Sequence, residues 1–184
     1  MYEQPQQNYN QQPQGCNINP QLAEDDVTRE LFPMPQPGES FVLKRGGIKF
    51  EGRLPERGKI TGSGCFFLTT KRIVFVASRK SNGKFYTNRE DFSSFEVPIQ
   101  NLTVTPKFHQ PFFWANYLEL QVRSSDESII PGVSTIYLSF YDGGYIYLYC
   151  QFFFCLELHY FFSLFTFEQS HAYTKNIANV FDKF

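Results

Sequence analysis

The side chains that most often carry chemistry are few and scattered in this chain of 184 residues. Its cysteines form no Cys-x-x-Cys pair, and its histidines stand at no recognisable metal-ligand spacing. These residues are Cys16, Cys65, Cys150 and Cys155, with His109, His159 and His171. No glycine-rich dinucleotide loop, Walker loop or Gly-x-Ser-x-Gly elbow occurs. We therefore expect a protein that is not an enzyme and that holds no metal or cofactor.

The thiols and the N-terminus predict the cellular setting. The N-terminus has no basic start followed by an apolar run, so a secretory signal is not expected. The cysteine spacing favours free thiols in a reducing environment. Together these features predict an intracellular protein, in the cytoplasm, the nucleus or both.

Positive charge is concentrated in the middle of a chain whose formal net charge is only -1. From Lys44 to Lys107 there are 13 Lys and Arg against 5 Asp and Glu. One interpretation is a solvated rim on a sheet; the other is a surface for lipid headgroups, other phosphate groups or an acidic partner. The candidate contacts are Lys44, Arg45, Lys49, Arg79, Lys80 and Lys84. Nucleic acid is not expected as a direct ligand, because these residues are not interleaved with aromatics in a stacking motif.

Short strands are the elements that must position these side chains. The stretch Cys65–Val76 reads as two strands, with Ile73, Phe75 and Ala77 predicted on one face of the second and Arg72, Val74 and Val76 on the other. Further strands are expected over 40–43, 48–50, 94–97, 101–105, 117–122 and 135–141. About seven strands and no helix before residue 144 predict a mainly β fold, an antiparallel barrel or sandwich.

The two ends of the chain differ from this middle. Residues 1–37 are rich in Gln, Asn and Pro and are predicted to be a disordered tail. Residues 145–165 form an apolar, aromatic insert, and residues 166–184 an amphipathic C-terminal helix. The apolar run has the length of a membrane span, but Gln151, Glu157 and His159 argue against one.

Two motifs carry a resemblance to a known family. The glycine-led entry Gly62-Ser63-Gly64 precedes a strand with the signature Leu68, Thr69, Arg72 and Phe75, which resembles that of GRAM domains. The second motif comprises Gln110, Pro111, Phe113, Ala115, Asn116 and Tyr117, and the turn Gly143-Gly144 closes the pattern. Together they resemble the GRAM domain of the WW domain-binding protein two family over residues 38–144. The resemblance implies a pleckstrin-homology-like fold of seven strands capped by a C-terminal helix.

In that family the helix soon follows the Gly-Gly turn, so residues 145–165 are an insertion. Two hypotheses remain open. The segment is either a genuine apolar extension that packs on the domain or docks in a membrane, or a translated unspliced intron, since AT-rich noncoding DNA encodes many Phe, Tyr, Ile and Leu.

The resemblance implies a non-catalytic adaptor that binds a protein partner, with a transcription-coactivator-type role. Family members bind WW domains through Pro-Pro-x-Tyr motifs, and this sequence contains none, so a WW-domain partner is not predicted. The alternative is a peripheral membrane module for phosphoinositides or other anionic lipids, as GRAM domains are often linked to phosphoinositides.

Two groups of motif residues have both a structural and a functional interpretation. Side chains such as Phe112, Phe113 and Trp114 most often anchor a loop against a barrel end, but they would equally suit an exposed patch for a partner. Arg72 either orients its hairpin through backbone or carboxylate hydrogen bonds or binds a ligand. Asn116 is expected to serve a turn or a cap.

Overall fold

Antiparallel strands dominate the computed structural model, which describes residues 15–124 and 130–141. The strands are β1 (Asn17–Ile18), β2 (Leu22–Glu24), β3 (Leu31–Pro33), β4 (Phe41–Leu54), β5 (Gly58–Thr69), β6 (Arg72–Ala77), β7 (Ser94–Pro98), β8 (Lys107–His109), β9 (Asn116–Arg123) and β10 (Val133–Phe140), with a single 3-10 turn, η1 (Ile99–Asn101), among the described residues. The predicted mainly β, antiparallel class is confirmed.

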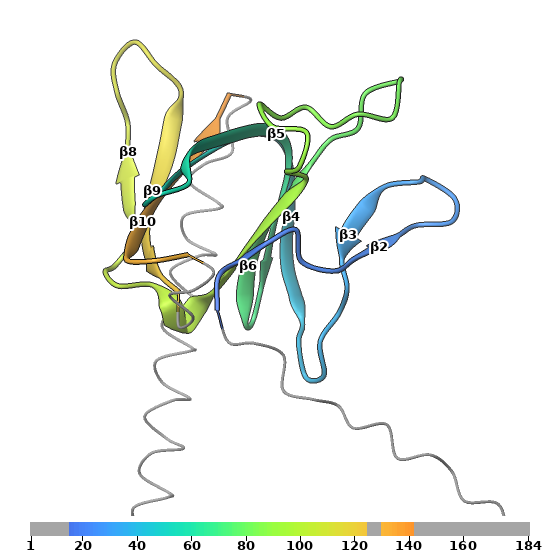
Figure 1. Ribbon diagram of the computed structural model, residues 1–184, viewed down its shortest axis with the longest axis horizontal. Helices are drawn as coiled ribbons and strands as arrows, with labels where there is room; N and C mark the ends of the chain where they lie inside the picture. The colour runs from blue at the N-terminus through green and yellow to red at the C-terminus, as the bar shows by residue number, and fades with distance from the viewer. Residues whose placement is uncertain (1–14, 125–129, 142–184) are drawn as a thin grey trace, which may run out of the picture.

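Eight of these strands form one curved sheet in the order β1-β7-β6-β5-β4-β10-β9-β8 (Figure 1). β2 and β3 pair only with each other, as a separate two-stranded sheet. In Figure 1 the β8–β9 hairpin projects on one side of the molecule and the β2–β3 hairpin on the other. About seven strands were expected, and the main sheet of the described chain has eight. β1 and β8 were not predicted, whereas the strands expected over 40–43 and 48–50 join in β4 and the one expected over 101–105 does not form.

Side chains that alternate along β5 and β6 place the main apolar core on one face of this sheet. Ile73, Phe75 and Ala77 belong to the main apolar cluster, as predicted, together with aromatic rings from β4, β7 and the loop before β7. The rings of Phe50 and Phe75 stack with their centroids 4.6 Å apart, and Phe92 and Phe95 pack beside Phe50. Fully burying one such side chain contributes about 1.5–3 kcal/mol, so this aromatic group stabilises the domain strongly.

Two glycines explain local features of β4 and β5. The two strands expected over 40–43 and 48–50 form one continuous strand, β4, with a bulge between Arg45 and Ile48. Gly47 has a φ of 70°, which L side chains rarely adopt, so it permits the bulge. At Gly64, a Cβ would lie 2.0 Å from the backbone oxygen of Val76, which explains the glycine-led entry to the hairpin.

The predicted disordered tail is wrong for residues 15–37. Leu22, Leu31 and Phe32 of the β2–β3 hairpin pack on Phe67 and Val74, which lie on the outer face of β5 and β6. The tail is poor in apolar residues on average, but these three side chains fall together once the hairpin forms. Composition averaged over the segment therefore hid a local apolar contact.

The remaining differences concern the second half of the chain. The strand expected over 101–105 is replaced by η1 and a loop in which Leu102 bridges to Val122 of β9. The predictions for Gly143, Gly144, the insert 145–165, the helix 166–184 and the disorder of residues 1–14 lie outside the described residues. No helix of the described part is long and apolar enough to cross a membrane.

Candidate functional site

The loop between β8 and β9 presents three consecutive aromatic side chains to solvent. We call Phe112, Phe113 and Trp114 the aromatic tip; their exposed fractions are 93%, 86% and 82%. The rings of Phe112 and Phe113 meet edge to face, with centroids 4.9 Å apart. The loop-anchoring interpretation is therefore wrong, because anchoring side chains would be buried against the barrel.

The strands below the tip hold it in place. His109 pairs across the hairpin with Tyr117, and their rings stack 4.5 Å apart. Phe108 packs partly against the core cluster. The other residues of this motif, Gln110, Pro111, Ala115 and Asn116, make the two ends of the loop rather than its point. The motif thus builds a supported hairpin whose end faces water.

A shallow cationic groove lies at the same end of the strands as the aromatic tip. It has a volume of about 490 Å³, and its lining includes Lys49, Lys80, Ser139, Tyr86 and Tyr141. Lys49 Nζ lies 4.5 Å from the ring centroid of Tyr141, and Lys80 Nζ lies 5.2 Å from that of Tyr86. Aromatic faces attract cations but leave their charge free to meet an anion.

Strand register places this groove relative to the tip. Lys49 pairs with Ser139, Ser139 with Tyr117, and Tyr117 with His109, so these four residues form one row across β4, β10, β9 and β8. Neighbouring strands lie about 4.8 Å apart, so Lys49 is roughly 14 Å from the base of the tip. The tip and the groove therefore share one end of the sheet.

The structure does not gather the six predicted basic contacts into one patch. Three of them form ion pairs with Glu side chains: Lys44 with Glu30 at 2.5 Å, Arg79 with Glu24 at 2.9 Å, and Lys84 with Glu90 at 2.7 Å. Arg45 is half-buried on β4. Only Lys49 and Lys80 of the six meet in the groove, whose lining also includes Glu51, itself held by Lys59 and Arg53.

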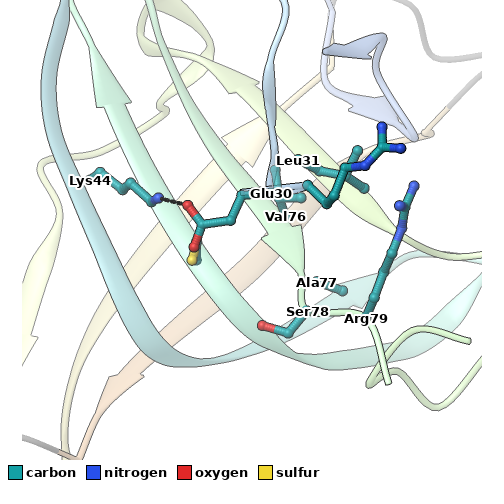
Figure 2. Close-up of a pocket in the computed structure, with 9 residues that line it drawn as sticks. Glu30, Leu31, Lys44, Val76, Ala77, Ser78 and Arg79 are labelled. Carbon is teal, nitrogen blue, oxygen red and sulfur yellow. Dashed lines mark hydrogen bonds and ion pairs between the residues drawn. The ribbon is translucent and has the colours of Figure 1, made fainter. Parts of the chain in front are cut away.

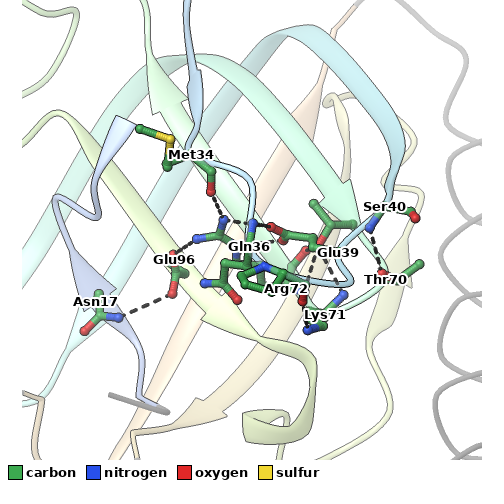
Figure 3. Close-up of polar contacts among 11 residues, drawn as sticks. Asn17, Met34, Gln36, Glu39, Ser40, Thr70, Lys71, Arg72 and Glu96 are labelled. Atoms are coloured by element: carbon green, nitrogen blue, oxygen red, sulfur yellow. Dashed lines mark hydrogen bonds and ion pairs between the residues drawn. The ribbon is translucent and has the colours of Figure 1, made fainter. Parts of the chain in front are cut away.

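Arg72 has a structural role at the centre of a buried polar network (Figure 3). Its guanidinium binds Glu39 through two hydrogen bonds, Nε–Oε1 at 2.7 Å and Nη2–Oε2 at 2.9 Å. It also donates to Glu96 on β7 and, at 2.5 Å, to the carbonyl oxygen of Met34. Asn17 completes the network by donating to Glu96 at 3.3 Å.

This network ties the N-terminal segment to the main sheet. Each of the three guanidinium nitrogens donates to a carboxylate or a carbonyl, so no ligand is needed to hold Arg72 in place, and the hairpin-orienting interpretation holds. Thr69 supports the same turn: its hydroxyl accepts from the backbone amide of Arg72 at 2.9 Å. Leu68 and Phe75 are buried in the core. The first motif is therefore structural throughout.

A second hollow lies under the β2–β3 hairpin (Figure 2), and two of the six predicted basic contacts, Lys44 and Arg79, line it. Its volume is about 270 Å³, and Lys44, Arg79, Glu30 and Cys65 are among its lining residues. Cys65 is half-buried, and burial raises the pKa of its thiol. The ion pairs that frame this hollow join residues up to 55 positions apart, which no local pattern reveals.

Comparison with known proteins finds partial sequence relatives. The chain is 35% identical over 81 residues to a stress-induced protein of Schizosaccharomyces pombe, covering 44% of this chain and 41% of that protein. It is 34% identical over 89 residues to a postacrosomal sheath WW domain-binding protein of Macaca fascicularis, covering 47% of this chain and 31% of that protein. The matches thus span less than half of either relative. No family model matches.

The second relative confirms the predicted resemblance to the WW domain-binding proteins over the aligned part. Among solved structures, the N-terminal PH domain of Vps36 is similar with a TM-score of 0.48 and 16% identity, covering 78% of this chain and 93% of that domain.

Proposed function

We propose that this chain carries a non-catalytic adaptor domain of GRAM type that presents its aromatic tip to a protein partner. The observation that carries the proposal is the near-complete exposure of Phe112, Phe113 and Trp114. Phe and Trp are enriched at the centres of protein interfaces, where burying one such side chain is worth about 1.5–3 kcal/mol. A tip built on stacked, paired strands can make such a contact without refolding.

A transcription-coactivator-type role is the finer form of this proposal. It is supported by the resemblance to the WW domain-binding protein two family. One relative is named for WW-domain binding. This sequence lacks Pro-Pro-x-Tyr, so a WW-domain partner is not part of the proposal.

Affinity capture with three matched proteins tests the protein contact. The chain is compared with F112S/F113S/W114S and with V27S/V104S, which replaces exposed apolar side chains away from the tip. We expect at least one protein to be retained by the chain and by the control but to bind the tip variant at least about 100-fold more weakly, since three buried rings are lost. Recovery of the same proteins with all three would contradict the proposal.

A peripheral membrane module is the second candidate, favoured by the shared position of the groove and the tip. Lys49 and Lys80 would meet anionic headgroups while the aromatic rings enter the interface, where Trp is enriched in membrane proteins. Each basic residue close to an anionic surface contributes about 1 kcal/mol.

Vesicles distinguish the two candidates. Trp114 is the chain's only tryptophan, so its emission reports on the tip alone. A blue shift on vesicles with a phosphoinositide or phosphatidylserine, lost in K49E/K80E but kept in R57E/R123E, would support membrane docking. Emission that stays unchanged on every vesicle at low salt would exclude it and leave the protein contact.

A further inference from the structure

The β2–β3 hairpin and its flanking residues form an acidic flap over the main sheet. We define the acidic flap as residues 20–33, which hold four carboxylates against one guanidinium. Its strands pair with each other and not with the main sheet. Within the described chain, the flap therefore contacts the main sheet through its side chains and not through strand pairing.

The flap is pinned at both ends. At one end Asn19, with a φ of 54°, accepts hydrogen bonds from the Ser93 and Ser94 amides at 2.8 and 3.2 Å. At the other end the Met34 carbonyl accepts from Arg72. These anchors hold the flap near the sheet even when its middle lifts, so rebinding is intramolecular.

The flap also has its own internal order. The Asp25 carboxylate accepts hydrogen bonds from the amides of Val27 at 3.0 Å and Thr28 at 2.7 Å. The Asp25 amide donates to the Glu30 carbonyl at 2.9 Å. The turn is therefore stabilised without help from the sheet, and the hairpin can move as a unit.

The surface beneath the flap is apolar at its centre and basic at its border. Phe67, Val74 and Val76 form the centre. Lys44 and Arg79 stand at the border, on opposite sides of the hollow in Figure 2. The flap is complementary to this surface. Its side chains Leu22, Leu31 and Phe32 pack on the apolar centre. Glu30 and Glu24 form ion pairs with Lys44 and Arg79, respectively.

We propose that this face of β5 and β6 is a binding site for an acidic peptide segment with aliphatic or aromatic residues, and that the acidic flap occupies it in cis. The flap supplies the template for the ligand: carboxylates for Lys44 and Arg79, and apolar side chains for the centre. Its ion pairs are exposed and each contributes only about 0.2–1 kcal/mol, so a peptide of the same chemistry competes with it. The site is separate from the aromatic tip and does not depend on it.

Alkylation of Cys65, followed by peptide mass spectrometry, tests the flap. Cys65 lines the hollow, so its reaction rate rises when the flap lifts. Loss of the Glu30 charge also lowers the pKa of the Cys65 thiol, so each rate is divided by the thiolate fraction taken from a pH profile. We expect the full chain carrying E24Q/E30Q to react about 2- to 10-fold faster than the unaltered chain after this correction. D26N/E56Q removes the same formal charge without an ion pair of the flap and should leave the rate unchanged. Equal corrected rates in E24Q/E30Q and the control would overturn the proposal. Circular dichroism is used to check that both variants fold, and E24Q alone replaces the double variant if the double variant does not fold.

A synthetic peptide of residues 20–33 tests the binding site. We expect it to slow Cys65 alkylation in E24Q/E30Q back toward the rate of the unaltered chain, whereas a peptide with the same composition in scrambled order does not. An unchanged rate at saturating peptide would overturn the proposal. Protection by phosphatidylserine vesicles but not by the peptide would also overturn it and make a lipid surface the occupant.

Discussion

The two motifs that carry the family resemblance use aromatic and polar side chains in opposite ways. In the first, Phe75 stacks in the core and Arg72 is fully engaged with buried carboxylates. In the second, Phe112, Phe113 and Trp114 stand in water on a supported hairpin. Side chains of similar chemistry therefore stabilise the fold in one motif and are available for binding in the other.

Loss of Arg72 should have the largest effect on the first motif. Arg72→Ala leaves Glu39 and Glu96 buried without their cation, and removing one partner of a buried ion pair destabilises proteins by about 3–5 kcal/mol. Urea unfolding measures the change. Arg53→Ala is the matched control, because it removes an exposed pair with Glu51 and should lower the free energy of unfolding by at most about 1 kcal/mol. Equal effects would show that the network of Arg72 does not hold the fold together.

Gly64→Ala should have the next largest effect. The new Cβ would meet the backbone of Val76, which cannot turn aside as a side chain does. We expect a loss of about 1–3 kcal/mol or more in the free energy of unfolding. At Gly46 the nearest atom to a Cβ is Cys65 Sγ at 3.8 Å, so Gly46→Ala should change stability much less. The reverse order in thermal unfolding would contradict the pairing of β5 with β6.

The Glu39 carboxylate should make stability depend on pH in the acid range. Burial alone would raise the pKa of Glu39, but hydrogen bonds from Arg72, Thr69 and a backbone amide outweigh it and lower that pKa below its ordinary value of 4.5. A carboxyl with a lowered folded pKa stabilises the fold above its unfolded pKa, and this stability is lost as pH falls from about 4.5 through the folded pKa.

Urea unfolding at a series of pH values measures this dependence. Glu39→Gln should flatten the slope between pH 4.5 and the acid limit of folding, whereas Glu56→Gln, at an exposed turn, should keep it. An unchanged slope in Glu39→Gln would show that other carboxylates control acid unfolding.

Removal of the aromatic tip should have the smallest effect on stability. In F112S/F113S/W114S the lost rings were already in water, so we expect the free energy of unfolding to change by no more than about 0.5 kcal/mol. Partner binding should fall sharply in the same variant. A large destabilisation would mean that the tip packs on the domain and would remove the contrast between the two motifs.

Local pattern predicts the strands well and the surfaces poorly. The two faces of β6 follow from alternation alone, and the structure places Ile73, Phe75 and Ala77 in the main core as predicted. The exposure of Phe112 to Trp114 depends on how far the β8–β9 hairpin extends beyond the rest of the sheet. The spacing of residues along the chain does not specify this extension.

Long-range ion pairs set a second limit on prediction. In the sequence, no acidic residue stands close enough to Lys44 or Arg79 to indicate a partner. The structure pairs them with Glu30 and Glu24 because the β2–β3 hairpin folds back over β5 and β6. The buried carboxylates that hold Arg72 come from Glu39 and Glu96, far apart in sequence. The chain topology, and not the local amino-acid composition, determines which of these charged residues form ion pairs.

The emission and iodide quenching of Trp114 in the free, full chain measure whether the aromatic tip is exposed to water. Since it is the only tryptophan, its signal belongs to the tip. An exposed tip predicts the long-wavelength emission of a water-exposed indole, quenched by iodide as readily as free tryptophan. Emission shifted to the blue and protected from iodide in the free protein would show that the tip is buried, and would contradict its role as an exposed binding element.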